Sequence, residues 1–174
     1  MKVSSKGIEF LKIREGFDPK CKVGDSWKAH YDSIAGIWDM PYGITKDLEG
    51  ESVKKNDIWT DSYVNEVFAG MVEQFENQIN KYIGKCELSE NQYDAIFSFV
   101  WNIGIGNFST STALKRILAK EYDKVPEAMM LFNGVVSKVK QPDGSIKKVK
   151  IPIKGIINRR NFEIKLWSEG DYGV

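Results

Sequence analysis

Apolar residues recur every three or four positions through two long segments in the middle of the chain. Across residues 61–83 this spacing continues up to Gly84, and glycine is the residue that most often ends a helix. Ser89 and Gln92 then have the spacing of a capping box, which starts a helix. The segment after them is apolar on several sides. We therefore expect a long amphipathic helix followed by a buried central helix that ends at Gly104.

Shorter patterns flank these two helices. The residues before Gly16 predict a short first helix, which begins with serines suited to cap it. Between residues 17 and 59, glycines and a proline interrupt short runs rich in Ile, Trp and Tyr, a pattern typical of small strands joined by tight turns. Further helices are predicted at about 110–120, from Pro126 to about 132, and over 156–167.

Residues 135–153 follow a different pattern, in which lysines alternate with apolar residues. Near the centre of this segment lies Gln141-Pro142-Asp143-Gly144, a sequence typical of a tight turn. We expect a protruding hairpin made of two lysine-bearing strands.

Together these patterns predict an α+β chain in which a small β-rich lobe, residues 17–59, is inserted between the first helix and a mostly helical lobe. The helical lobe comprises residues 1–16 and 60–174, with the hairpin at about 135–153 as an insertion. Residues 1–174 have the size of a single domain. Two lobes joined by a long helix enclose a cleft, and clefts are the usual binding sites.

The composition narrows the possible chemistry. The 174 residues are 42% hydrophobic and 12% aromatic, as in a globular domain. One histidine, His30, and two cysteines, Cys21 and Cys86, leave few ways to build a zinc site or a histidine-based triad. Both need several converging nitrogen or sulfur donors. We therefore expect a chemistry that relies on carboxylates rather than on a zinc site or a histidine-based triad.

The net charge of +1 hides an uneven distribution. Residues 134–160 contain eight Lys/Arg and one acid, Asp143, which gives this segment +7 and the rest of the chain −6. Either the segment is a solvated surface, or it attracts an anionic polymer such as a cell wall, lipopolysaccharide or RNA. The charge alone does not choose between these.

The N-terminal segment has no apolar core of the kind found in secretion signals, and no window is apolar over the length of a membrane span. We therefore expect no signal peptide and no stable insertion into a membrane. Two cysteines are too few for a disulfide framework, so free thiols are expected. A Cys21–Cys86 disulfide is the alternative if the protein is released outside the cell.

Carboxylates and aromatic rings are interleaved near the expected cleft. The residues are Glu15, Asp18, Asp25, Asp32 and Asp39, together with Trp27, Tyr31, Trp38 and Tyr42. Cleavage of a glycosidic bond needs a protonated acid at the leaving oxygen and a charged carboxylate near the anomeric carbon, and aromatic rings stack on sugar faces. Aspartates are also common in surface turns, so both interpretations stay open at this point.

Several longer motifs follow one another along the chain. They are Arg14-Glu15-Gly16-Phe17, Lys28-Ala29-His30-Tyr31-Asp32-Ser33, Gly36-Ile37-Trp38-Asp39-Met40-Pro41-Tyr42-Gly43-Ile44-Thr45, Leu88-Ser89-Glu90-Asn91-Gln92-Tyr93-Asp94-Ala95, Asn102-Ile103-Gly104-Ile105-Gly106-Asn107-Phe108 and Gly155-Ile156-Ile157-Asn158-Arg159-Arg160. In this order they resemble the motifs of phage-type lysozymes, the endolysins of glycoside hydrolase family 24. The resemblance covers nearly the whole chain.

The resemblance implies a lysozyme-like fold and a muramidase that cleaves the β-1,4 bond between N-acetylmuramic acid and N-acetylglucosamine in peptidoglycan. It implies inversion at the anomeric carbon and no metal or cofactor. Glu15 matches the general acid of the family, and Asp32 matches its aspartate. The expected partner is the glycan strand of peptidoglycan, with no nucleic acid, and a monomer is the simplest expectation. Such a protein is made in the host cytoplasm and acts on the wall, in the periplasm or outside the cell, after release.

This sequence departs from the family pattern at the cleft. Asp39 stands where the family has threonine, Pro41 where it has glycine, Ile44 where it has histidine, and His30 where it often has tyrosine. Threonine helps to hold a neutral water on the far face of the sugar, whereas a carboxylate changes both charge and reach. Our hypothesis is that Asp39 shares or takes over the role of the base, while Asp32 stabilises positive charge in the transition state. An Asp39 about 5 Å from Glu15 would instead act as a nucleophile and retain configuration.

Three more residues are candidates for substrate binding. Asn102 either donates to an N-acetyl carbonyl or caps the central helix. Tyr42 either lines the cleft or fills the β-rich lobe. Arg160, like Arg159, either binds muropeptide carboxylates or braces the last helix by ion pairs. His30 is interpreted as a hydrogen-bonded or surface residue rather than a base.

Two other functions are compatible with the sequence. The changes at Asp39, Pro41 and Ile44 would fit a catalytically impaired, lysozyme-like glycan-binding protein, which binds sacculi without releasing reducing sugar. The basic stretch 138–160 would fit a binder of nucleic acid or anionic membranes with a steeply salt-dependent affinity. The presence of both Glu15 and Asp32 favours the active enzyme.

Overall fold

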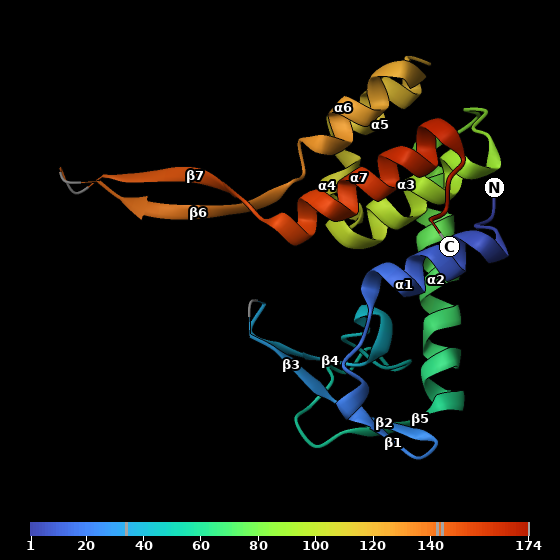
Figure 1. Ribbon diagram of the computed structural model, residues 1–174, viewed down its shortest axis with the longest axis vertical. Helices are drawn as coiled ribbons and strands as arrows, with labels where there is room; N and C mark the ends of the chain where they lie inside the picture. The colour runs from blue at the N-terminus through green and yellow to red at the C-terminus, as the bar shows by residue number, and fades with distance from the viewer. Residues whose placement is uncertain (34, 142, 144, 174) are drawn as a thin grey trace.

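A computed structural model describes residues 1–33, 35–141, 143 and 145–173. Its helices are α1 (Ser5–Glu15), α2 (Asp61–Ile83), α3 (Glu90–Ile103), α4 (Ile105–Ser109), α5 (Thr112–Leu118), α6 (Val125–Met130) and α7 (Lys154–Glu169). Its strands are β1 (Lys22–Val23), β2 (Ser26–Lys28), β3 (His30–Asp32), β4 (Ile37–Asp39), β5 (Ile58–Thr60), β6 (Gly134–Lys140) and β7 (Ile146–Pro152). Short 3-10 helices are η1 (Pro19–Cys21), η2 (Pro41–Gly43) and η3 (Tyr122–Lys124). The predicted α+β order of one helix, a β-rich region and then mostly helices is confirmed (Figure 1).

The first helix, α1, leads directly into the β-rich region. The Ser4 side chain caps it by accepting a hydrogen bond from the backbone N–H of Gly7. Phe10 and Leu11 are fully buried and hold the helix against the core. Its last residue, Glu15, therefore projects from a fixed helix at the point where the chain turns away.

The central helix, α3, is surrounded by other helices. Every residue from Tyr93 to Trp101 is buried, and the predicted capping box of Ser89 and Gln92 is present. Helices α1, α2 and α7 pack against it, and Figure 1 shows α7 lying along α3. Because burial of each large apolar side chain contributes about 1.5–3 kcal/mol, α3 is the element that fixes the positions of its neighbours.

The long helix α2 links the two regions. It begins where β5 ends, with the Thr60 side chain accepting a hydrogen bond from the backbone N–H of Tyr63, and it ends at Gly84, as predicted. In Figure 1 it runs from the β-rich region to the helical region. The β-rich region itself contains the antiparallel sheet β1-β2-β5 and the separate pair β3-β4.

Strands β6 and β7 form the hairpin expected near residues 135–153, and it projects away from the helices (Figure 1). At its base, a Cβ added to Gly134 would overlap the backbone carbonyl of Ile151, so only glycine fits there. The backbone N–H of Ile153 also donates to the carbonyl of Asn133 at 3.0 Å. Pro142 and Gly144 of the predicted turn lie outside the described residues.

Two predicted helix boundaries differ from the structure. The helix expected at about 110–120 begins at Thr112 and is preceded by the separate short helix α4. The break follows from a side-chain cap, because Ser111 accepts a hydrogen bond from the backbone N–H of Leu114 and so starts a new helix. The last helix begins at Lys154, earlier than predicted.

The described residues include no helix with the length and apolar character needed to cross a membrane. Cys21 and Cys86 are both free thiols. Cys21 lies in η1, and the Sγ of Cys86 lies 3.6 Å from the backbone carbonyl of Ile117.

The buried carboxylate of Asp94 ties the start of α1 to the central helix. Its Oδ1 accepts a hydrogen bond from the backbone N–H of Ser4 at 2.9 Å. Its Oδ2 accepts hydrogen bonds from the hydroxyls of Ser4 and Tyr172. The side chain is only 1% exposed. Since α1 carries Glu15, this cluster fixes one end of the helix whose other end reaches the cleft.

Replacing Asp94 with alanine leaves three donors without their acceptor. We expect Asp94→Ala to lower the free energy of unfolding by about 2–4 kcal/mol, measured by urea denaturation. The control is Glu66→Ala on an exposed position of α2, for which we expect a change within about 0.5 kcal/mol. Equal effects of the two substitutions would contradict the anchoring role of Asp94.

Candidate active site

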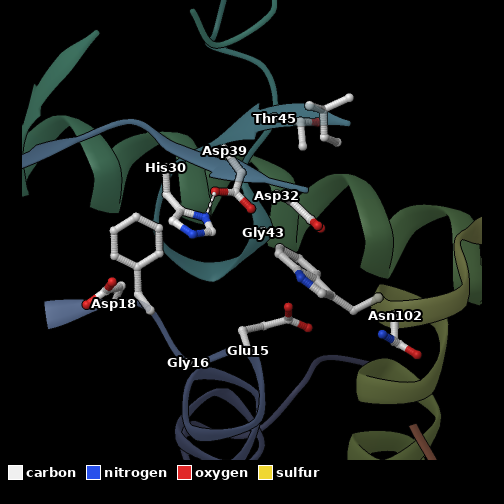
Figure 2. Close-up of a pocket in the computed structure, with 12 residues that line it drawn as sticks. Glu15, Gly16, Asp18, His30, Asp32, Asp39, Gly43, Thr45 and Asn102 are labelled. Carbon is white, nitrogen blue, oxygen red and sulfur yellow. Dashed lines mark hydrogen bonds and ion pairs between the residues drawn. The ribbon is translucent and has the colours of Figure 1, made fainter. Parts of the chain in front are cut away.

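A cleft of about 550 Å³ lies between the end of α1, the β3-β4 pair and the end of α3. In Figure 2, Glu15 projects from one side of it, and His30, Asp32 and Asp39 project from the other. Among the described residues, those that line it are Glu15, Gly16, Phe17, Asp18, His30, Asp32, Ile37, Asp39, Gly43, Thr45, Trp101 and Asn102. The structure therefore brings together the three carboxylates that the sequence singled out as catalytic candidates, Glu15, Asp32 and Asp39.

The carboxyl group of Glu15 is held through one of its two oxygens. Oε1 accepts a hydrogen bond from Nη2 of Arg159 at 2.7 Å, and the side chain is 14% exposed. Oε2 faces Gly43, where an added Cβ would lie 3.3 Å away. Gly43 also has a φ of 75°, so both its backbone and this close approach favour glycine. The second oxygen thus faces the cleft wall at Gly43.

Arg159 connects three helices beneath this carboxyl group. From α7, its Nη2 also donates to the backbone carbonyl of Ser98 in α3 at 3.3 Å. Its Nε donates to Oε1 of Glu163, one turn later in α7, at 3.0 Å. A planar guanidinium that satisfies three acceptors has one permitted position. The direction of Glu15 is therefore set by the packing of α1, α3 and α7 together.

Arg160 is fully buried next to this network. Its Nη1 lies 2.7 Å from Oε2 of Glu163, and its Nη2 donates to Oδ1 of Asn102. Burial raises the pKa of Glu163, while the positive charges of Arg160 and Arg159 oppose that rise. The structure does not bring Arg160 to the cleft. It places this arginine where it braces α7 against α3, which is the alternative considered from the sequence.

Asp39 and His30 form a pair on the opposite wall of the cleft. In the register of β3 and β4, His30 lies directly opposite Asp39, and paired residues share one face of a sheet. Nδ1 of His30 lies 3.2 Å from Oδ1 of Asp39 (dashed line in Figure 2). Burial raises the pKa of Asp39, the hydrogen bond and charge of His30 lower it, and the negative charge of Asp32 raises it.

Asp32 lies at the end of β3, on the same face as His30. Its Oδ1 accepts a hydrogen bond from the backbone N–H of Ala35 at 3.0 Å, so the turn after β3 orients its carboxylate. Its register partner is Ile37. His30 and Asp32 are two residues apart in β3, so their side chains lie on the same face. Asp39 lies opposite His30, so the carboxylates of Asp32 and Asp39 face the same space.

Asn102 and Tyr42 differ in their positions. Asn102 lines the cleft at the end of α3. Tyr42 is not among the lining residues: its ring packs against Phe68 at a centroid distance of 4.9 Å, and the Lys12 ammonium lies 4.7 Å from the ring centre. Its carbonyl accepts a hydrogen bond from Nε1 of Trp101 at 3.1 Å. The ring therefore packs against α1 and α2 of the helical lobe, rather than lining the cleft or filling the β-rich lobe.

Other lining residues were not selected from the sequence. Trp101 was part of the apolar pattern of α3 and was assigned to the core, and it is indeed only 8% exposed. Phe17 lines the cleft while its ring packs against His30 and Trp27. Trp101 and Phe17 are apolar residues of the kind found in any core, so their residue type does not predict that they line a cleft. Within the described ranges, no three His, Cys, Asp or Glu side chains are placed to hold a metal ion.

Residues 24–163 match the family described as phage lysozyme. The chain belongs to the phage lysozyme family. It is 31% identical over 168 residues to an endolysin of Acyrthosiphon pisum secondary endosymbiont phage 1, an alignment that covers 96% of this chain and 98% of the relative. The endolysin of Salmonella phage P22 is 32% identical over 132 residues, or 76% of this chain and 84% of the relative. The solved endolysin from Escherichia coli O157:H7 phage FAHEc1 has a TM-score of 0.76 and 31% identity, covering 99% of this chain and 96% of that one.

These similarities confirm the resemblance inferred from the motifs and the lysozyme-like α+β fold. The protein is a phage lysozyme of the endolysin type, a muramidase and glycoside hydrolase that acts on peptidoglycan in cell lysis. In this lysozyme, the cleft between Glu15 and Asp39 is the candidate active site.

The pairing of His30 with Asp39 predicts a measurable shift in the ionisation of the carboxyl group. We expect the pKa of Asp39 to be higher in His30→Ala than in the wild type, because the substitution removes the group that lowers it. The measurement is a carbon NMR titration of the Asp39 carboxyl, with the signal assigned by its absence in Asp39→Asn. His30→Asn keeps a side-chain donor and should show a smaller rise. An unchanged or lower pKa in His30→Ala would refute the pairing.

Proposed function

We propose that this lysozyme hydrolyses the β-1,4 bond between N-acetylmuramic acid and N-acetylglucosamine, with Glu15 as the general acid and Asp39 and Asp32 as base and charge stabiliser. The observation that carries the proposal is the arrangement of the carboxyl groups. Glu15 lies on one wall of the cleft, and Asp32 and Asp39 lie on the other. A glycan strand between the walls would have an acid on one side and a carboxylate on the other, as inverting hydrolysis requires.

Glu15 is suited to donate a proton to the leaving oxygen. Arg159 holds Oε1, so we assign the transferable proton to Oε2. Transfer of this proton to the glycosidic oxygen lets the bond to the anomeric carbon break while the leaving sugar departs as a neutral alcohol. Gly43 gives Oε2 the space that a larger residue would fill.

Asp39 is suited to activate water from the opposite wall. As a base it takes one proton from a water molecule, whose oxygen forms the new bond to the anomeric carbon. A base must be ionised, and the His30 side chain favours that form of Asp39. Asp32 lies on the same face of the β3-β4 pair as Asp39. It supplies negative charge near the positive charge that develops on the sugar. Asn102 lines the cleft at the end of α3, which supports a role for its side chain in binding an N-acetyl group.

The proposed substrate is peptidoglycan, which determines where the enzyme acts. The expected site of action is the host cell wall during lysis, as for the endolysins to which the chain is similar. The chemistry uses only the carboxyl groups of the cleft and water. No described feature favours the impaired glycan-binding alternative over the active enzyme, since Glu15, Asp32 and Asp39 all line one cleft.

Removal of the acid tests the assignment of Glu15. We expect Glu15→Gln to release muropeptides from purified peptidoglycan about 10²–10⁴-fold more slowly than the wild type, because glutamine cannot donate the proton. Reducing-sugar release measures the rate. The control is Glu9→Gln, an exposed residue of the same helix, which should keep wild-type activity. Equal rates for Glu15→Gln and the wild type would refute the assignment, and no activity in either would favour the glycan-binding alternative.

The stereochemistry of the first product tests the role of Asp39. If Asp39 acts as a base on water, the configuration inverts and proton NMR of fresh product shows the α anomer. If Asp39 attacks the sugar directly, two inversions give the β anomer. We expect the α anomer, and a β product would contradict the base role.

A further inference from the structure

The β6-β7 hairpin has two chemically different faces. Because paired residues share a face and alternate along each strand, the register places four lysines on one side, which we call the lysine face. This face consists of Lys138, Lys140, Lys148 and Lys150, with Val136 and Ile146. The opposite face consists of Val135, Ser137, Val139, Lys147, Val149 and Ile151. The charge excess noted in the sequence is thus concentrated on one side of a ribbon.

The lysine face is not neutralised by the protein itself. Lys138 lies directly opposite Lys148 in the register, and like charges in this position destabilise a strand pair. Within the described part of the chain, none of the hairpin lysines forms an ion pair. The acid of the connecting turn, Asp143, accepts hydrogen bonds from Ser145 instead. An external anion would therefore remove a repulsion that is built into the hairpin.

The hairpin is held firmly at its base and continues directly into α7. Only glycine fits at position 134, and Asn133 and Ile153 are hydrogen-bonded across the base. Helix α7 starts at Lys154 and carries Arg159, the partner of Glu15. In Figure 1 the hairpin and the tip of β3-β4 extend to the same side of the molecule. Each strand of seven residues spans about 20 Å, so the lysine face extends well away from the helical region.

We propose that the lysine face binds the acidic peptide stems of peptidoglycan and holds the enzyme on the wall while the cleft acts on the glycan. The identity of this polymer rests on the proposed function. The face matches its chemistry, since lysines suit carboxylates and the side chains of Val136 and Ile146, 65% and 68% exposed, suit the alkyl groups of the stems. Arg159 and Arg160 take no part, because both are engaged in the helical network.

A flat anionic bilayer fits this hairpin less well. Membrane-binding amphipathic elements insert an apolar face and place their cations at its rim, where the lipid phosphates lie. In this hairpin the face opposite the lysine face carries Val135, Val139, Val149 and Ile151, and we call it the apolar face. Four of the five hairpin lysines lie on the other side. A bilayer that received the apolar face would leave these lysines directed away from the phosphates. A thin polymer strand, in contrast, can lie along the lysine face.

The test compares two triple variants with the same change in net charge. In the first, Lys138, Lys140 and Lys148 are replaced by glutamine. In the matched control, the exposed residues Lys55, Lys81 and Lys85 are replaced by glutamine. Co-sedimentation with purified sacculi in the cold measures binding, and hydrolysis of a short uncharged oligosaccharide measures the cleft. We expect the hairpin variant to bind sacculi about tenfold more weakly, from the combined loss of three exposed charge contacts, while the control is unchanged and both hydrolyse the oligosaccharide normally.

Further arms separate the explanations. Replacing Lys138, Lys140 and Lys148 by arginine keeps the charge and should keep sacculus binding. Equal binding by the hairpin variant and the control would overturn the proposal. Lysine-dependent binding to vesicles of anionic phospholipid, with unchanged sacculus binding, would overturn it in favour of a membrane. Binding is measured without turnover, so a wild type that binds through these lysines but releases no reducing sugar would refute the proposed function and not this surface.

Discussion

The buried guanidinium of Arg159 is the contact on which the geometry of the cleft depends. It joins Glu15 at the end of α1, the carbonyl of Ser98 in α3 and Glu163 in α7. An arginine in this position without its partners would carry the cost of an uncompensated buried charge. The three helices are therefore most stable in the one arrangement that satisfies it. Since Glu15 is the last residue of its helix, this contact fixes the direction of a carboxyl group that lies at a helix end.

The opposite wall is positioned by different physics. There the hydrogen-bond ladder of β3 and β4 sets which side chains face the cleft. A slip of one residue would turn the side chains of one strand, either His30 and Asp32 or Asp39, away from those of the other. The register also explains two departures from the family pattern together. Asp39 replaces a threonine, and its partner on the paired strand is His30, where the family often has tyrosine. Nδ1 of His30 and Oδ1 of Asp39 lie 3.2 Å apart, so a change at either residue alters the surroundings of the other.

The sequence predicted what local patterns and motifs determine. Regular apolar spacing and caps identified α2 and α3, and the alternating lysines identified β6 and β7. The family motifs selected the carboxylates that line the cleft. Features that depend on tertiary packing could not be predicted from the sequence. In the sequence, Arg160 is indistinguishable from other charged helical residues. Its role depends on its contacts with Asn102 of α3 and Glu163 of α7. The direction of the Tyr42 ring follows from Phe68 on a distant helix. The break before α5 has a local cause, the cap at Ser111, which the apolar pattern alone did not reveal.

The partial burial of Asp39 has a consequence for the folding equilibrium. A carboxyl group whose pKa is higher in the folded than in the unfolded chain favours folding most at pH values below its unfolded pKa. That contribution is lost as the pH rises through the folded pKa. The ionised form of Asp39, which can accept a proton, is therefore the form that the folded state disfavours relative to the unfolded chain. The rest of the protein has to offset this loss, so part of its stability serves to keep a reactive group in an environment that opposes its charge.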